Sequence, residues 1–390
     1  MTKKPDAPAI RFKGFSDAWE QRKTIDIADY SKGNGYSKGD LTDAGTPIIL
    51  YGRLYTKYQF AISEVDTFAV PRNGAVYSQG NEVIVPASGE TAEDIARASA
   101  VEKSGVMLGG DLNILRPFDF ISPLFLALTI SNGEPQKELA KKAQGKSVVH
   151  IHNTDIQEVT IAYPSRTEQD RIVSVFRQLD NLITLHQRKF EKLTNVKKSM
   201  LEKMFPQNGC SYPEIRFKGF TDAWEQRKWI NTVDISTNMV DPKSGKYDLL
   251  PHVAPGNIES FTGRLYDNVK LVGEENLISG KFVFNVGDIV YGKINPQLGK
   301  YVFARFSGLT SADAYVLNAK NGIVQKFLYA VIQTRDFYDY SVSVSKRSGM
   351  PKINRDELNA YSYWAPSESE QLKIGEYLLT LDHLITLHQR

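Results

Sequence analysis

Lysine, arginine, asparagine and glutamine side chains occur in predicted loops that follow short apolar runs of the sequence. These side chains, together with nearby hydroxyl groups, can contact the phosphates of duplex DNA and the base edges in its major groove. The candidate DNA-binding residues are Tyr36, Ser37, Lys38, Arg53, Lys57, Arg72, Asn73 and Lys146 in the first half, and Lys293, Asn295, Gln297, Lys346, Arg347, Lys352 and Arg355 in the second half. Any one of them alone is more typical of a solvated surface residue, but as a set these loops are the better candidates for DNA contact, and the basic stretch 188–203 can face phosphate or only water.

Catalytic motifs are incomplete wherever part of one occurs. The string "AQGKS" (143–147) resembles the end of a phosphate-binding loop, but Ala140 stands where that loop needs glycine. The string "NPQL" (295–298) lacks the second proline and the aromatic residue of an adenine methyltransferase motif. His150 and His152 alternate on a predicted strand without the further ligands of a metal site. We therefore expect no catalytic residues, no metal and no cofactor in this chain, which favours a binding protein over an enzyme.

Composition is typical of a folded protein with more than one domain. The 390 residues are 41% hydrophobic and 24% charged. The only cysteine is Cys210, and the N-terminal residues do not resemble a signal peptide, so we expect a cytoplasmic protein. The most apolar segment, residues 120–130, is too short to span a bilayer and predicts a buried helix. A net charge of +3 neither requires nor excludes a nucleic-acid partner.

The sequence is a tandem repeat. Residues 10–23 and 215–228 are the same peptide apart from Ser16 and Thr221, and residues 179–188 return almost unchanged at 381–390. Between these segments the halves share an apolar pattern, such as "EVIVPASG" (82–89) with "DIVYGKIN" (288–295), but differ at most polar positions. We predict two similar domains, residues 1–166 and 207–367, each followed by a helix, residues 167–206 and 368–390. Like scaffolds with unlike surfaces suggest two recognition functions.

Apolar residues in both predicted helices recur at alternating steps of four and three, which is the spacing of a coiled-coil seam. One interpretation is that each helix packs only on its own domain. The other is that the two helices pack together, antiparallel, with a pseudo-twofold axis between the domains. The residues expected in the seam are Ile172, Phe176, Leu179, Ile183, His186 and Leu193 in the first helix, and Ile374, Leu378, Leu381, Ile385 and His388 in the second.

The repeated segments resemble those of the specificity subunit of Type I restriction-modification enzymes. The similarity rests on "WEQRK" (19–23 and 224–228), on "PSxxEQ" (164–169 and 366–371), and on "LITLHQR" at 182–188 and 384–390. It covers the chain from about residue 8 to residue 390. The second helix departs from the family pattern, because it has no counterpart of residues 189–205. Either part of that helix is missing or partner docking is weaker than in the family.

The resemblance implies an α+β fold in which two mixed α/β target recognition domains are joined by two long antiparallel coiled-coil helices. It implies a non-catalytic reader of double-stranded DNA, in which each domain reads one half of an asymmetric bipartite site. Two modification subunits would dock on the helices and methylate adenine with S-adenosylmethionine, and restriction subunits that use ATP and Mg²⁺ would join them. No membrane partner is expected.

Two other functions stay open at this point. The chain can be a coiled-coil scaffold that joins two proteins without reading DNA, or the reading portion of a fused modification enzyme. The repeated peptide also has two interpretations. It can be a stable local turn with Phe12, Phe15 and Trp19 in the core, or a handle that presents the same docking surface to two identical partners.

Overall fold

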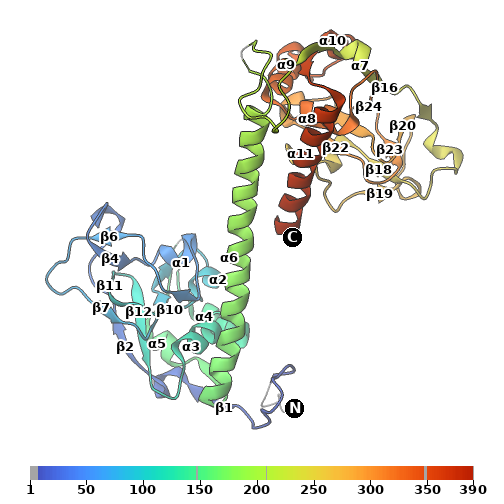
Figure 1. Ribbon diagram of the computed structural model, residues 1–390. Coiled ribbons are helices and arrows are strands. Elements are labelled where there is room, and N and C mark those ends of the chain that lie inside the picture. The colour runs from blue at the N-terminus through green and yellow to red at the C-terminus, as the bar shows by residue number, and fades with distance from the viewer. Residues whose placement is uncertain (1–7, 146–147, 208, 347–348, 390) are drawn as a thin grey trace. The chain divides into compact units, whose positions relative to one another are not determined.

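In the computed structural model the chain forms two compact units, which divide between Leu182 and Ile183. The structure describes residues 8–145, 148–207, 209–346 and 349–389. Both units combine sheets with helices, as predicted (Figure 1). Within the described residues, no helix has the length and apolar character needed to cross a membrane.

The first unit contains two five-stranded sheets. One has the strand order β2-β12-β8-β10-β5, formed by Ala28–Lys32, Leu112–Pro117, Glu82–Pro86, Ser99–Val101 and Ala61–Ile62. The other has the order β3-β6-β4-β11-β7, formed by Leu41–Thr42, Phe68–Ala69, Thr46–Ile49, Ser104–Leu108 and Tyr77–Gln79. Two antiparallel pairs complete the strands: β1 (Glu20–Lys23) with β14 (Thr160–Tyr163), and β9 (Ser88–Gly89) with β13 (Val149–His150). The helices are α1 (Arg53–Thr56), α2 (Ala92–Ile95), α3 (Pro123–Ile130), α4 (Gly133–Lys142), α5 (Asn153–Gln157) and the first part of α6 (Arg166–Lys203).

Strand β8 lies at the centre of the first unit and is buried over its whole length. Successive side chains of a strand point to opposite faces of the sheet. Accordingly Val83 and Val85 enter one apolar cluster, which α3 covers, and Ile84 enters another. Glu82 is buried in this apolar strand, and its carboxylate accepts hydrogen bonds from the backbone N–H groups of the preceding turn, the shortest at 2.7 Å from Gln79. The helix predicted within residues 120–130 is confirmed as α3.

The second unit repeats this architecture. One sheet has the order β16-β24-β21-β22, formed by Val233–Ile235, Ala314–Ala319, Ile289–Gly292 and Tyr301–Phe303. The other has the order β17-β20-β23-β18-β19, formed by Met239–Val240, Lys281–Phe284, Gly308–Thr310, Pro251–Val253 and Lys270–Leu271. Strand β15 (Glu225–Lys228) pairs with β25 (Ser362–Ala365). The helices are α7 (Trp229–Thr232), α8 (Gln325–Val331), α9 (Arg335–Ser345), α10 (Arg355–Ala360) and α11 (Glu368–Gln389).

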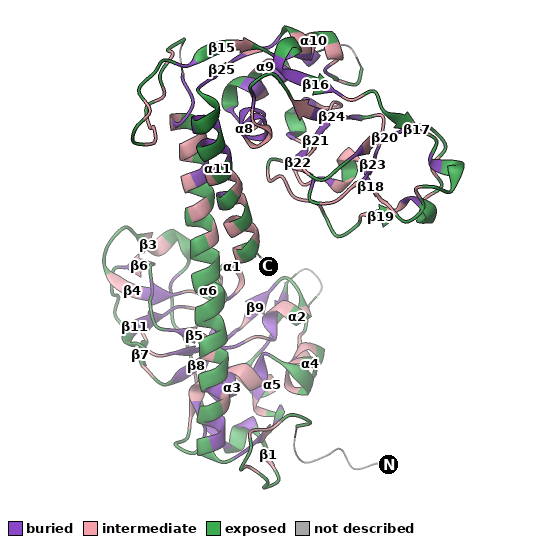
Figure 2. Ribbon diagram, turned by 45° about the vertical axis from the view of Figure 1, so that its right-hand side comes forward, coloured by how far each residue is buried: buried purple, intermediate pink, exposed green. Residues whose placement is uncertain are grey.

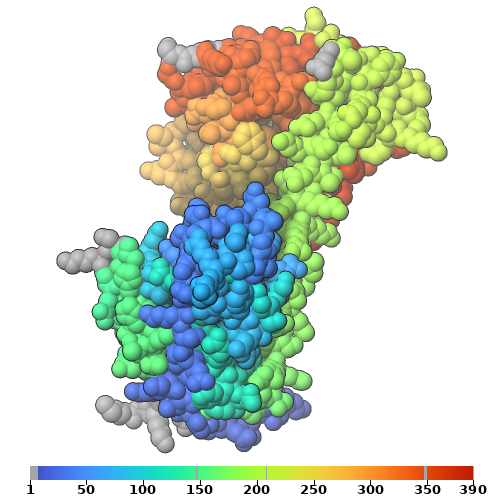
Figure 3. Space-filling model, turned by 90° about the vertical axis from the view of Figure 1, so that its left-hand side faces the viewer, coloured from blue at the N-terminus to red at the C-terminus, as the bar shows by residue number. Residues whose placement is uncertain are grey.

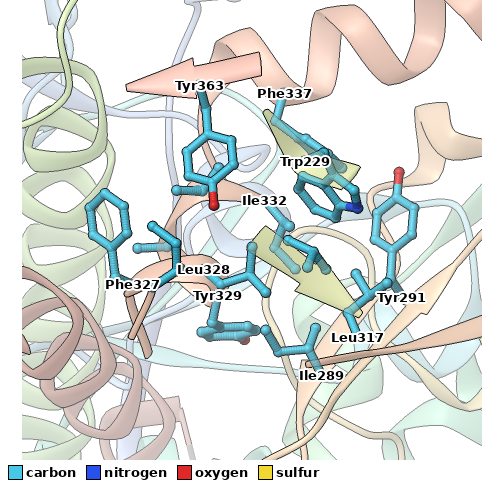
Figure 4. Packing of buried hydrophobic residues seen from close by; sticks show 14 of the residues in the cluster. Trp229, Ile289, Tyr291, Leu317, Phe327, Leu328, Tyr329, Ile332, Phe337 and Tyr363 are labelled. Atoms are coloured by element: carbon cyan, nitrogen blue, oxygen red, sulfur yellow. The ribbon is translucent and has the colours of Figure 1, made fainter. Parts of the chain in front are cut away.

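The core of the second unit follows the same alternation. Ile289 and Tyr291 of β21 enter a cluster with Trp229, whereas Val290 enters a separate cluster on the other face. Trp229 stacks on Phe337 with ring centroids 5.3 Å apart (Figure 4). The shared strand order, β2-β12-β8-β10 in one unit and β16-β24-β21-β22 in the other, confirms the predicted correspondence of residues 82–89 with 288–295.

Helix α6 has 38 residues without glycine or proline, and Pro206 follows shortly after its end. In the second unit its C-terminal part packs beside α11 (Figure 1), where Leu193 joins the core cluster that contains Leu378 and Leu381. The two helices run antiparallel, because positions later in α6 meet positions earlier in α11. Lys197 pairs with Asp382, and His186 meets His388. Antiparallel packing of the two helices, as predicted, is thus present between α11 and the C-terminal part of α6.

The same heptad positions differ in burial between the two repeats (Figure 2). Phe176, Leu179 and Ile183 are 46%, 48% and 54% exposed, whereas Leu378 and Leu381 are 1% and 6% exposed. In the second unit the C-terminal part of α6 covers these positions. The packing predicted for Phe176, Leu179 and Ile183 therefore stays a prediction. Ile172 packs partly against the core of the first unit, Ile374 is buried, and Ile385 is half-buried.

The repeated peptide joins the start of each unit to the first turn of its helix. Arg11 donates two hydrogen bonds of 2.7 Å to the carboxylate of Glu168, and Arg216 makes the same pair with Glu370 at 2.7 and 2.8 Å. Each glutamate side chain is 1% exposed, so the arginine neutralises a buried charge. The peptide thus has a structural role in each unit.

Gln169, the second residue of the "EQ" motif, is also held by defined contacts. Its side-chain oxygen accepts from the backbone of Ser122 at 2.8 Å, and its amide nitrogen donates to the carbonyls of Phe120 and Pro164. Gln371 makes the equivalent contacts in the second unit. The aromatic residues of the repeated peptide contribute unequally to the cores. Trp19 packs edge-on against Phe125 with ring centroids 5.9 Å apart, but Phe12 and Phe15 lie outside the apolar clusters.

Candidate nucleic-acid interface

Two candidate loops of the second unit lie side by side. The loop after β21 carries Lys293, and residues 349–355 carry Lys352. The backbone N–H of Ile353 donates to the carbonyl of Lys293 at 3.0 Å, and the N–H of Asn295 donates to the carbonyl of Pro351 at 2.8 Å. These bonds hold two segments that are about sixty residues apart in the chain side by side.

The aromatic ring of Tyr315, on β24, lies near two cations of these loops. The Lys293 Nζ is 5.2 Å from the ring centroid, and the Arg355 Cζ is 5.5 Å from it. The guanidinium of Arg355 also donates to the backbone carbonyls of Ile235 and Ser236 at 2.7 and 2.8 Å. Cation–π contact and these hydrogen bonds fix the Arg355 charge in place. We call Lys293, Lys352 and Arg355 the basic cluster.

Asn295 and Gln297 lie in the tight loop that follows Lys293. Asn295 and Gly299 both adopt the left-handed conformation, with φ of 50° and 54°. The loop is held from one side by Phe261, whose N–H donates to the Gly299 carbonyl at 2.8 Å, and by Tyr338, whose hydroxyl donates to the Gln297 carbonyl at 3.3 Å. A side chain at Gly299 would collide with the Phe261 ring at 2.5 Å. The loop therefore presents its two amide side chains from a braced backbone.

Lys346 is exposed at the end of α9. Arg347 and Lys146 lie outside the described residues, so their predicted roles stay predictions.

In the first unit the candidates form two separate groups, whose segments, blue in the space-filling view, lie at the surface (Figure 3). The first group is built on Tyr36, which is buried. Its hydroxyl accepts from the backbone N–H of Arg72 at 2.7 Å, and the Arg72 guanidinium lies 5.1 Å from the Tyr36 ring centroid. Asp40 accepts a hydrogen bond from the Ser37 N–H and forms an ion pair with Arg72. These contacts lower the pKa of Asp40 to about 2. Lys38 and Asn73 are exposed beside this group.

The second group consists of Arg53 and Lys57, both paired with Asp66 at 2.6 Å. The Arg53 guanidinium also donates to Gln59 and to the backbone carbonyl of Glu64. The Lys57 ammonium and then Arg53 hold the pKa of Asp66 well below its usual range. With its side chain only 9% exposed, Arg53 braces the loop before β6, whereas Lys57 keeps an exposed charge.

Several functional neighbours were not among the residues predicted from the sequence. Tyr315 reads as part of an apolar strand, and its contact with two cations depends on strands and loops from three parts of the chain. No sequence pattern indicates a role for Phe261, because only the fold brings it against Gly299. The ion pairs made by Asp40 and Asp66 also could not be predicted from the sequence, because ion pairs between separate loops leave no local pattern.

Comparison with known proteins agrees with this architecture. Residues 16–195 and 235–390 match the sequence profile of the Type I restriction modification DNA specificity domain. The Escherichia coli Type I restriction enzyme EcoDI specificity subunit is 26% identical over 263 residues, which span 61% of this chain and 58% of that protein. The Type I restriction enzyme MjaVIII specificity subunit of Methanocaldococcus jannaschii is 21% identical over 82% of this chain and 76% of that protein.

A solved structure has the same fold. The S subunit of a Type I restriction-modification system from M. genitalium superposes with a TM-score of 0.60 at 14% sequence identity. The superposition covers 99% of this chain and 94% of that one. The profile match takes in most of both units, so the chain belongs to the Type I restriction-modification DNA specificity family.

Proposed function

We propose that the chain is the DNA-reading subunit of a Type I restriction-modification complex and that each unit reads one half of an asymmetric bipartite site. The observation that carries the proposal is that the two units share a scaffold but differ in their candidate DNA-binding loops. The two units share a strand order and the same arginine–glutamate joint. Their candidate loops nevertheless hold different side chains: a tyrosine–arginine–aspartate group in the first unit and the basic cluster in the second.

The proposal assigns the repeated joint a second role in assembly. Lys13 and Asp17 of the first unit are exposed, and so are their counterparts Lys218 and Asp222. Each unit thus has the same exposed side chains in the peptide that forms the buried ion pair. One kind of partner can bind both, and two adenine-methylating modification subunits fit this requirement. The family resemblance supports this stoichiometry.

In this proposal the chain itself is non-catalytic and holds no cofactor. S-adenosylmethionine would be bound by the modification subunits, and ATP and Mg²⁺ by restriction subunits that complete the complex. The helices α6 and α11 would set the distance between the half-sites. Such a complex would work in the cytoplasm, where it meets the DNA.

Domain exchange tests the proposal. The chain is co-expressed with its modification subunits in cells without other adenine methylation, and modified bases are mapped across the genome. Wild type should yield one motif with two specified halves separated by an unspecified gap. Replacing residues 229–368 with the interior of another family member should change one half of the motif, and replacing residues 24–166 should change the other. Assembly of the subunits without any motif would contradict DNA reading and favour a scaffold.

A further inference from the structure

Lys293 of the second unit occupies the place of Ala87 in the first. The backbone N–H of Ala87 donates to the carbonyl of Asp111 at 2.8 Å, and the N–H of Lys293 donates to the carbonyl of Asp313 at 3.0 Å. Each residue follows the central buried strand of its unit, β8 or β21. The two positions are therefore equivalent in three dimensions, although one side chain carries a charge and the other does not.

The support beneath this position is also equivalent. In the first unit the Asn113 side chain donates to the carbonyl of Ile151 at 2.9 Å. In the second, the Tyr315 hydroxyl donates to the carbonyl of Ile353 at 3.3 Å. A buried polar group thus anchors the same neighbouring segment in both units. Only the second unit uses an aromatic ring, which can also attract cations.

The other two members of the basic cluster have uncharged or weakly basic counterparts. Asn153 donates to the Ser31 carbonyl at 3.0 Å, in the place where Arg355 donates to the carbonyls of Ile235 and Ser236. Lys352 forms a β-bridge with Ile294, and His150 pairs in the same way within β9 and β13. One backbone frame therefore holds three permanent cations in the second unit and none in the first.

We infer that Lys293 and Lys352 of the second unit bind phosphates of the DNA backbone, and that the first unit makes no such contact at the equivalent place. The inference deepens the proposed function and rests on it. It means that the two units bind their half-sites differently. The electrostatic, sequence-independent part of this contact would come from the second unit.

The electrostatics of the basic cluster favour an anion. Burial lowers the pKa of Lys293, and the charges of Lys352 and Arg355 lower it further against the opposing effect of Asp313. Among the described residues, neither Lys293 nor Lys352 forms an ion pair. The cations thus repel one another, and Asp313 partly compensates this repulsion at Lys293. A phosphate placed between the two ammonium groups would relieve this repulsion, whereas a neutral base edge would not.

Salt dependence of binding tests the inference. The full chain, assembled with its modification subunits, is titrated with a duplex that contains its mapped site at salt concentrations between about 50 and 200 mM. Each phosphate contact contributes about 0.9 to the slope of log affinity against log salt. The double variant K293Q/K352Q should therefore bind with a slope smaller by about 2. Its preferred sequence should stay that of the wild type, and its melting curve should match.

Two further variants control for charge and for position. K246Q/K270Q removes two exposed lysines of the same unit and should leave the slope nearly unchanged. H150K adds a cation at the equivalent place of the first unit and should steepen the slope by about 1. An unchanged slope in K293Q/K352Q would overturn the inference, and so would a changed base preference, which would show direct base reading. A wild-type complex that binds no duplex would instead overturn the proposed function itself.

Discussion

The imidazole rings of His186 and His388 meet in the second unit, with their Nδ1 atoms 2.9 Å apart and their ring centroids 5.0 Å apart. The two histidines stand at equivalent positions of the two repeats, 202 residues apart in the sequence. Equivalent residues of antiparallel helices can touch only where a local twofold axis crosses the pair. This contact therefore marks the symmetry point of the α6–α11 seam.

The contact should be sensitive to acid. Burial lowers the pKa of His388, and the nearby charges of Lys189 and His186 lower it further. Because the pKa is lower in the folded chain, the stabilising contribution is present above the unfolded value of about 6.5 and is lost as the pH falls through the folded value. The denaturation midpoint of the wild type should drop below about pH 6.5 more steeply than that of H388N. Parallel pH profiles would contradict this assignment.

The ion pair of Lys197 with Asp382 should couple the same two helices. Their side chains are 10% and 12% exposed, and Lys197 also donates to Gln333 at 2.6 Å. Burial raises the pKa of Asp382, against the opposing effect of Lys197. Removing Lys197 alone would leave a buried carboxylate without its cation, so K197M should cost about 3 kcal/mol of stability in urea unfolding. The double variant K197M/D382L should recover most of that loss, and equal losses in both would refute the pairing.

The two arginine–glutamate joints should act locally and independently. Arg216→Ala should leave the buried Glu370 unpaired at a cost of about 3 kcal/mol or more. Hydrogen exchange should then accelerate in residues 213–224 and at the start of α11, but not in residues 10–19. Arg11→Ala is the matched control and should give the reverse pattern. Faster exchange in both joints from either change would show that the units are not independent.

Asp40 should limit the contribution of the first unit to DNA binding. It pairs with Arg72, which is 58% exposed and lies beside the exposed Lys38. Asp40→Asn would remove a negative charge and release the Arg72 guanidinium. We expect tighter duplex binding and a salt slope steeper by about 1 in filter or anisotropy titrations. Asp43, an exposed residue of the same segment, provides the control. Asp43→Asn removes a charge without releasing an arginine.

The length of α6 should set the gap between the half-sites, if the proposed function holds. Inserting four residues between Leu185 and His186 adds about one turn, or about 6 Å of helix. At about 3.4 Å per base pair of one strand, the unspecified gap of the methylated motif should lengthen by about two base pairs. Both half-sites should keep their sequences. Altered half-sites with an unchanged gap would exclude a spacer role for this helix.

Local and repeated patterns were sufficient to predict the scaffold. The duplicated peptides indicated two like units, the short apolar runs indicated the central strands, and the uninterrupted heptad pattern indicated α6. These features can be predicted from the sequence because each depends on residues close together in the chain, or on the same segment occurring twice. The family resemblance follows from the same segments.

Which side chains of the candidate loops are paired with other residues was decided only by the tertiary structure. From the sequence, Lys293, Lys352 and Arg53 were equivalent candidates. In the fold, Lys293 and Lys352 lie on adjacent segments, whereas Arg53 forms an ion pair with Asp66. Likewise, two copies of one heptad pattern differ in burial: the C-terminal part of α6 covers Leu378, whereas Leu179 is exposed. Charge pairing and burial depend on which distant segments meet, and that information resides in long-range contacts rather than in any local spacing of residues.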